Sequence, residues 1–205
     1  MKTLTRNMQQ ALTPDNALAL LKAGNTRFVS NLKINRNLLQ QVNETRDGQF
    51  PFAAILSCID SRAPAELIFD QGLGDIFSIR IAGNFINEDI LGSMEFACKI
   101  AGSKLIVVLG HTDCGAIKGV CDGVELGHLT QMLAKIRPAA DKVTDIDIRN
   151  SSNLSFVNKV VHQNVELALQ EITKRSSVLR ELVSEGNLKI IGAIYDIETG
   201  EVKFL

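Results

Sequence analysis

The 205-residue sequence has little net charge and no long apolar run. Its 22 lysine and arginine residues stand against 23 acidic residues, so no strong field would attract nucleic acid or an anionic membrane surface. We expect neither partner, and a small, weakly steered substrate instead. No apolar block of signal-peptide length precedes Pro14. We therefore expect neither a secretion signal nor a membrane span.

Internal repeats, low-complexity tracts and linkers are also absent from the sequence. With 45% hydrophobic and 22% charged residues, the composition is that of one ordinary globular domain with a sizeable core. We predict a single domain over residues 1–205. It comprises an N-terminal helical arm (1–49), a core that carries the principal motifs (50–120), and C-terminal helices with the last strands (121–205).

Strand-like and helical segments alternate from residue 50 onward. This alternation predicts an α/β fold with a central, mostly parallel sheet of four to five strands flanked by helices. The run Leu105–Leu109 is apolar on both faces, as expected of a central strand covered on both sides. The expected strands are 52–56, 76–81, 105–109, 188–195 and a short one after 201. The expected helices are 14–29, with Thr13 as N-cap, 65–69, 88–101, one directly after Gly115, 126–136, 154–172 and 178–183.

Two short clusters each follow a strand-like run: Cys58-Ile59-Asp60-Ser61-Arg62 and His111-Thr112-Asp113-Cys114. At the carboxyl ends of two strands, the thiols of Cys58 and Cys114 and the imidazole of His111 can converge on one metal ion. Three ligands of this type match a catalytic zinc with an open fourth position, and thiolates favour Zn²⁺ over Mg²⁺ or Ca²⁺. The alternative is two buried thiols and a core or surface histidine.

The sequence contains four cysteines, enough for two disulfides. Two of the four stand beside histidine and aspartate in ligand-like spacing, which favours thiolates in a reducing compartment. We therefore predict a cytoplasmic protein with one Zn²⁺ per subunit. The other two, Cys98 and Cys121, are expected to be small buried hydrophobic residues. His128 and His162 are expected to be structural or surface residues.

Asp60 and Arg62 are two residues apart, so their side chains can project to the same side and form a charge-assisted pair. An ionised Asp60 can orient a zinc-bound hydroxide, or it can bind zinc itself as a fourth ligand in a closed state. Arg62 would decide between these two arrangements. The alternative is an exposed ion pair or a helix cap, and a cap is our expectation for Asp113.

These motifs resemble the β-class carbonic anhydrases, in which Cys-x-Asp-x-Arg is followed about fifty residues later by His-x-x-Cys-Gly. The similarity extends through residues 60–66, 80–84 and 110–115 and to Tyr195-Asp196, and it is strongest from Gln49 to Val120. It implies that Cys58, His111 and Cys114 bind zinc and that Asp60 and Arg62 form a catalytic dyad. The implied activity is the zinc-dependent reversible hydration of carbon dioxide to bicarbonate and a proton through a zinc-bound hydroxide.

The resemblance also implies substrate contacts and an assembly. Gln49 and the backbone N–H of Gly115 would hold the substrate, and Phe77 and Phe96 would line the cleft, one of them from a partner subunit. A homodimer or a dimer of dimers is implied, with the N-terminal helical arm packed on the partner. Hydrolysis of carbon disulfide or a related small electrophile on the same site stays open, as does zinc binding without catalysis.

One departure from the family pattern concerns tryptophan, which is absent from the sequence. Members regulated by a non-catalytic bicarbonate site carry tryptophan three residues before the first cysteine, where this chain has Ile55. The resemblance is therefore to the plant-like subtype. It implies an open zinc site at neutral pH, with Asp60 paired to Arg62.

Overall fold

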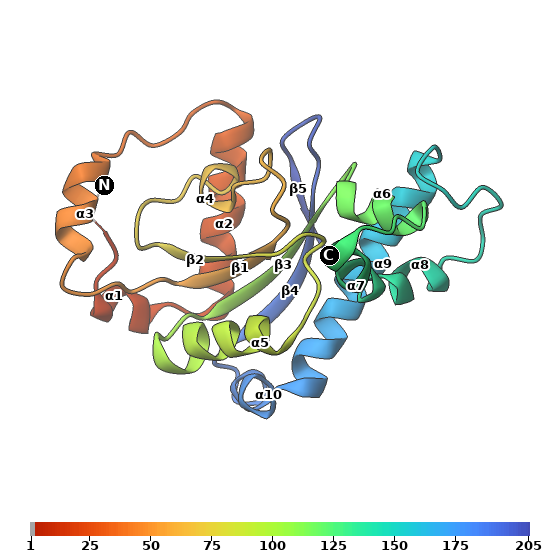
Figure 1. Ribbon diagram of the computed structural model, residues 1–205. Coiled ribbons are helices and arrows are strands. Elements are labelled where there is room, and N and C mark those ends of the chain that lie inside the picture. Colours follow the sequence, from red (N-terminus) through yellow and green to blue (C-terminus); the bar gives the residue numbers. More distant parts are fainter. Residues whose placement is uncertain (1–2) are drawn as a thin grey trace.

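A single sheet forms the centre of the computed structural model, which describes residues 3–205. Five strands of these residues lie in the order β2-β1-β3-β4-β5. The first four are mutually parallel, and β5 runs antiparallel to β4. This arrangement confirms the predicted α/β fold (Figure 1). The strands are β1 (Ala53–Ser57), β2 (Ile76–Arg80), β3 (Leu105–His111), β4 (Lys189–Tyr195) and β5 (Val202–Phe204).

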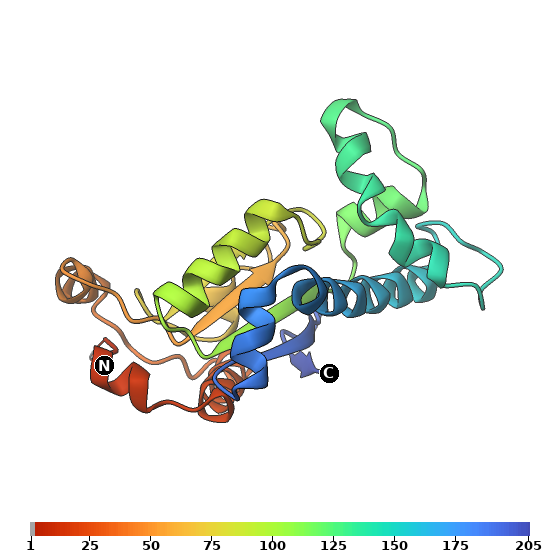
Figure 2. The same cartoon turned by 90° about the horizontal axis from the view of Figure 1, so that it is seen from below.

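Helices cover both faces of the sheet (Figures 1 and 2). Ile55 and Val107 point to the face covered by α2 (Pro14–Val29) and α4 (Ala65–Ile68). Their neighbours Leu56 and Val108 point to the opposite face, because successive strand residues alternate between faces. That face packs against α5 (Glu88–Glu95), the π-helix η1 (Phe96–Ile100), α9 (Leu154–Arg175) and α10 (Ser177–Ser184).

The remaining helices lie at the two ends of the molecule (Figure 2). At one end are α1 (Arg6–Ala11) and α3 (Leu38–Thr45), and at the other are α6 (Gly115–Cys121), α7 (Gly127–Ala134) and α8 (Arg137–Lys142). Helices α1 and α8 were not expected from the sequence. Pro138 lies in the first turn of α8, where proline begins a helix as readily as it ends the preceding one.

The predicted start of α2 is confirmed. Thr13 is the N-cap, its hydroxyl accepts a hydrogen bond from the N–H of Asn16 at 3.1 Å, and Pro14 is the first helical residue. The helix expected over 88–101 differs in part, because its last turn is a π-helix. Apolar spacing alone does not distinguish these two forms. No helix within residues 3–205 has the length and apolarity needed to cross a membrane.

Candidate metal centre

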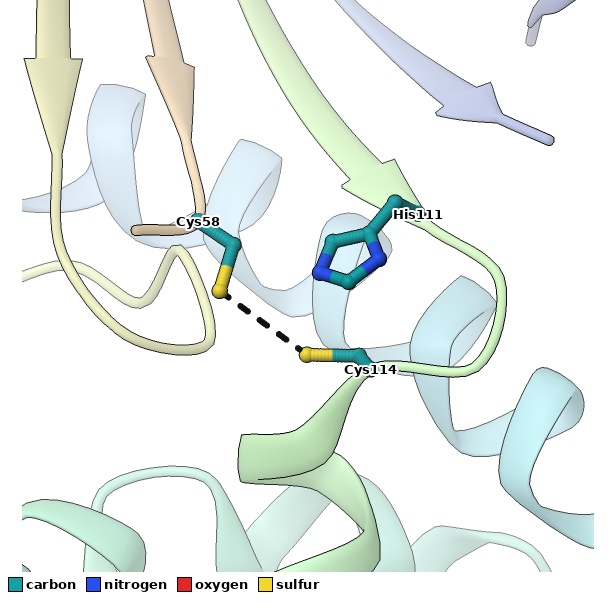
Figure 3. Close-up of side chains that lie close together, drawn as sticks. All are labelled: Cys58, His111 and Cys114. Carbon is teal, nitrogen blue, oxygen red and sulfur yellow. Dashed lines mark hydrogen bonds between the residues drawn. The ribbon is translucent and has the colours of Figure 1, made fainter. Parts of the chain in front are cut away.

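The structure brings the three predicted ligands together at one edge of the sheet. Cys58 follows β1, His111 ends β3, and Cys114 is the N-cap of α6. Their side chains point toward one another (Figure 3), and their ligand atoms all lie within 4.8 Å of each other. All three residues are buried. Because β1 and β3 are parallel neighbours, their carboxyl ends deliver these residues to the same place.

The two sulfurs lie 4.0 Å apart, with the Cys114 thiol donating to Cys58 (Figure 3). This hydrogen bond lowers the pKa of Cys58 to about 4, although burial opposes it. The same bond and burial raise the pKa of Cys114. The shared hydrogen bond therefore favours the thiolate at Cys58 and the thiol at Cys114. A metal dication that displaces the shared proton would be bound by two thiolates.

His111 presents a free nitrogen to this pair. Its Nδ1 lies 2.9 Å from the carbonyl oxygen of Thr112, so Nδ1 carries the proton and donates it. Nε2 is then a lone-pair acceptor, and it is buried without a hydrogen-bond partner. An unpartnered buried nitrogen is costly, and metal-ligating histidines are typically fixed in this way. Two sulfurs and one imidazole nitrogen fit zinc.

Asp60 lies at the edge of the cluster and is paired with Arg62. The guanidinium Nε donates to Oδ1 at 3.0 Å, and Nη2 donates to Oδ2 at 2.8 Å. Arg62 thereby lowers the pKa of Asp60 to about 2. Oδ2 of Asp60 is 3.9 Å from Nε2 of His111. The carboxylate therefore stands ionised beside the ligands while both of its oxygens are bound to Arg62.

The expectation that Asp113 caps the following helix is wrong. The N-cap of α6 is Cys114, and no side chain caps this helix end. The Asp113 carboxylate instead pairs with Lys118, and it lies 3.6 Å from Nη1 of Arg62. Asp113 also has a φ of 56°, in the left-handed region, and its carboxylate is engaged by these cations rather than by the start of the helix.

A hollow of about 290 Å³ opens beside Cys58 and Asp60. Gly115, the predicted substrate contact, lines it at the start of α6. A side chain at this position would meet no neighbour within 4 Å, so the backbone there is accessible. The rest of the wall is mainly apolar and consists of Ile59, Ala82, Ala116, Gly119, Leu129, Met132 and Leu133.

Three predicted substrate residues lie outside this hollow. Gln49 is exposed and lines a different depression, beside the end of α3. Phe77 and Phe96 face each other with ring centroids 6.2 Å apart, and they line a third hollow, between β2 and α5. Within the part of the chain that is described, these residues do not meet the cysteine cluster. Their roles stay predictions that need a partner subunit.

Arg80 and Gly83 contact the site but had no predicted role. Arg80 Nε donates to the carbonyl of Cys58 at 2.9 Å, and Arg80 Nη2 donates to the carbonyl of Asp60 at 2.6 Å. The N–H of Gly83 donates to the Cys58 sulfur at 3.4 Å. Both residues lie at or just after the end of β2, which is a parallel neighbour of β1. The carboxyl ends of the two strands therefore reach the same edge of the sheet, and this placement was the signal that could have identified them.

The other cysteines and histidines lie away from the cluster. Cys98 is buried in the core as predicted, whereas Cys121 is only partly buried. His128 is exposed and His162 half-buried, in agreement with structural or surface roles. Among the described residues, one group can hold a metal ion, and it consists of Cys58, His111 and Cys114.

Comparison with known proteins gives a consistent result. A family model described as carbonic anhydrase matches residues 53–202. The chain is 33% identical over 192 residues to a carbonic anhydrase of Mycolicibacterium smegmatis, covering 93% of this chain and 92% of the relative. It is 36% identical over 191 residues to carbonic anhydrase 2 of Mycobacterium tuberculosis, covering 91% and 90%.

Solved structures show the same relationship. The β-carbonic anhydrase CafA of Aspergillus fumigatus matches with a TM-score of 0.72 and 26% identity, covering 93% of this chain and 89% of that one. A structure of two tetrameric β-carbonic anhydrases from Sordaria macrospora matches with a TM-score of 0.68 and 26% identity, covering 98% of each chain. On this evidence the chain belongs to the carbonic anhydrase family, in its β class, and is an enzyme of the lyase type whose general activity is carbon dioxide hydration.

Proposed function

We propose that this chain hydrates carbon dioxide reversibly to bicarbonate and a proton, using one zinc ion per subunit. The observation that carries the proposal is the convergence of Cys58, Cys114 and the unpartnered Nε2 of His111 within 4.8 Å. These residues would hold the ion and leave a fourth position to water. Bound zinc supplies an activated water that is deprotonated at near-neutral pH and can attack carbon dioxide.

Asp60 and Arg62 would act together on that water. Arg62 engages both carboxylate oxygens, so its charge opposes movement of Asp60 onto the metal. Oδ1 accepts two hydrogen bonds from Arg62, one from its backbone N–H at 2.9 Å and one from Nε at 3.0 Å, whereas Oδ2 accepts one and keeps a free lone pair. Asp60 then accepts the hydrogen of the attacking group and orients it, which is the positional contribution expected of a general base.

The substrate would enter the hollow beside Cys58, where an uncharged gas suits the apolar wall and the Gly115 N–H can bind a developing bicarbonate oxygen. Gln49, Phe77 and Phe96 would complete the site across a subunit interface. We therefore propose a homodimer or dimer of dimers with the N-terminal arm packed on the partner. We further propose that residues 1–205 act as one domain in the cytoplasm.

The test compares two cysteine variants. Cys114→Ser removes a proposed ligand, whereas Cys121→Ser makes the same change at the end of α6, outside the cluster. Metal analysis is expected to find about one zinc per chain in the wild type and in Cys121→Ser, with rapid carbon dioxide hydration in both. Cys114→Ser is expected to lose zinc and hydration together. Full hydration by Cys114→Ser would refute the proposal.

A further inference from the structure

The turn that follows β2 is built around Gly83. The N–H of Asn84 donates to the carbonyl of Ile81 at 2.9 Å, and Gly83, the third residue of this turn, has a φ of 75°. Positive φ at the third position is the requirement of a type II turn, and glycine meets it without strain. A Cβ on Gly83 would also stand 2.3 Å from Cδ1 of Ile136. The turn therefore has one well-defined shape.

Gly83 joins a metal ligand to a distant helix. Its N–H donates to Sγ of Cys58 at 3.4 Å, and its carbonyl accepts a hydrogen bond from Nδ2 of Asn164 at 2.8 Å. Both bonds are buried. Asn164 lies on α9, which packs on the face of the sheet opposite α2. Asn164, Gly83 and Cys58 thus form a chain of contacts from α9 to the proposed metal centre.

The side chain of Asn164 is polar among mostly apolar helix neighbours, at the wall of a hollow that Lys135, Glu171 and Arg175 also line. It is 4% exposed, and its neighbours on α9 include the buried Val161, Val165 and Ala168. Among the described residues, its one hydrogen bond goes to Gly83. Burial of an amide costs free energy unless hydrogen bonds compensate. The bond to Gly83 compensates the burial of the Nδ2 donor, which an apolar residue at this position would not carry.

We propose that Asn164 is a positioning residue for the metal centre. By holding the Gly83 carbonyl, it keeps the turn in place and the Gly83 N–H directed at the Cys58 sulfur. An N–H that donates to a metal-bound thiolate withdraws electron density from the sulfur and fixes the orientation of the ligand, and loss of such outer contacts typically costs about 10- to 100-fold in metal affinity or activity. The inference rests on the proposed metal site.

The test uses protein loaded with Co²⁺ in place of Zn²⁺, because thiolate-to-cobalt charge-transfer absorption reports on the ligand sulfurs. Asn164→Leu keeps the size of the side chain and removes its donor. We expect the band to move to lower energy, since a thiolate without its hydrogen bond gives up an electron more easily. In the zinc-loaded variant, zinc release to a chelator is expected to be about 10-fold faster. Asn164→Ser, whose hydroxyl is too short for the bond, should show both effects.

Asn158 gives a matched control. It lies earlier on the same helix, and its Oδ1 is buried without a partner, so Asn158→Leu makes the same chemical change without touching the turn. Its band and zinc release are expected to match the wild type. Wild-type behaviour of both Asn164 variants would overturn the proposal, even if their melting temperatures fell. A wild-type protein that binds no Co²⁺ would instead contradict the metal centre itself.

Discussion

At the scale of single residues, the site depends on how side chains are held rather than on their presence alone. His111 donates through Nδ1 to Thr112 and so exposes Nε2 to the cluster. Asp60 is held by two guanidinium nitrogens and the backbone N–H of Arg62. In each case a second group fixes the orientation of the first. A variant that keeps the charge but loses the geometry therefore tests this account.

Arg62→Lys is such a variant. Lysine keeps the positive charge but cannot bind both carboxylate oxygens in a fork, so Asp60 should lose its fixed orientation. We expect carbon dioxide hydration (kcat/KM) to fall by about 100-fold with unchanged zinc content. Arg180→Lys, an exposed arginine on α10, should retain full activity. Wild-type hydration by Arg62→Lys would contradict the proposed role of this pair.

The sequence predicted the cysteine and histidine cluster because its chemistry is local. Cys58, His111 and Cys114 each follow a strand-like run, and the parallel sheet brings those ends together. The bond of Asn164 to Gly83 was not predictable in this way, since the two residues are far apart in sequence and the signal is a single amide in a helix. Asp113 was assigned wrongly because cap preference ignores the nearby cations Arg62 and Lys118.

At the scale of elements, a buried ion cluster attaches the N-terminal segment to the body. The Asp70 carboxylate accepts a hydrogen bond from Arg27 Nε at 2.6 Å, another from the N–H of Ile34 at 3.2 Å, and a third from Arg36. Burial opposes ionisation, but these bonds outweigh it and lower the pKa of Asp70. The cluster therefore links α2 and the segment before α3 to the end of α4.

Removal of this carboxylate should be costly. Asp70→Asn leaves Arg36, whose side chain is 7% exposed, without its negatively charged partner, and the expected loss in the free energy of unfolding at pH 7 is about 3 kcal/mol. Asp15→Asn breaks the exposed pair with Lys189 and should cost less than about 1 kcal/mol. Both values are measured by denaturant unfolding. Equal losses in the two variants would contradict the structural role of the cluster.

The direction of the pKa shift fixes how this difference depends on pH. The folded-state pKa of Asp70 lies below its unfolded-state value of about 4. The stabilisation that the carboxylate provides is therefore fully present at pH values above that unfolded-state pKa. The stabilisation is lost as pH falls through the lowered folded-state pKa. The gap in stability between wild type and Asp70→Asn should therefore be constant above this range and shrink below it. A gap that grows toward acidic pH would contradict the assignment.

Helix contacts at Gly24 give a second prediction at this scale. A Cβ there would lie 1.8 Å from the carbonyl oxygen of Phe69, at the end of α4. Gly24→Ala should therefore push α2 away from α4 and destabilise the protein by about 3 kcal/mol. Gly92, within α5, has no neighbour within 4 Å of such an atom, and Gly92→Ala should stabilise by up to about 1 kcal/mol. Thermal unfolding of the two variants and the wild type measures both changes in stability.

The order of elements was largely predictable, because buried parallel strands are apolar runs and the helices between them are amphipathic. The Thr13-Pro14 start of α2 follows from capping chemistry alone. Helix α1 and the π-helical form of η1 were not predicted, because their local sequence signals are weaker. Helix α1 has six residues, too few for a clear period, and η1 differs from an α-helix only in its hydrogen bonding.

At the scale of the whole molecule, the proposed site is incomplete in one chain. Gln49, Phe77 and Phe96 lie away from Cys58 in the structure. Phe96, which packs against Phe77 of the edge strand β2, is 54% exposed, and Ile100 at the end of η1 is 73% exposed. These exposed apolar residues favour a subunit contact there. The expectation of a subunit contact comes from the sequence resemblance, and the exposure of these apolar residues supports it.

Phe96→Glu tests the subunit contact. A charge at this position should weaken the interface, so light scattering is expected to show a wild-type dimer or larger assembly and a variant mass closer to the 22.4 kDa of one chain. Hydration should fall with the mass. Ile148→Glu, at an exposed apolar residue in the loop after α8, should change neither. A fully active wild-type monomer would contradict the assembly.

The central claim is that carbon dioxide hydration depends on a metal held by Cys58, His111 and Cys114. The most direct measurement removes zinc from the wild-type protein with a chelator and returns it in steps while hydration is followed. The account predicts no hydration without zinc and a linear recovery that ends at about one zinc per chain. Hydration that persists in the zinc-free protein, or that does not return with zinc, would contradict it.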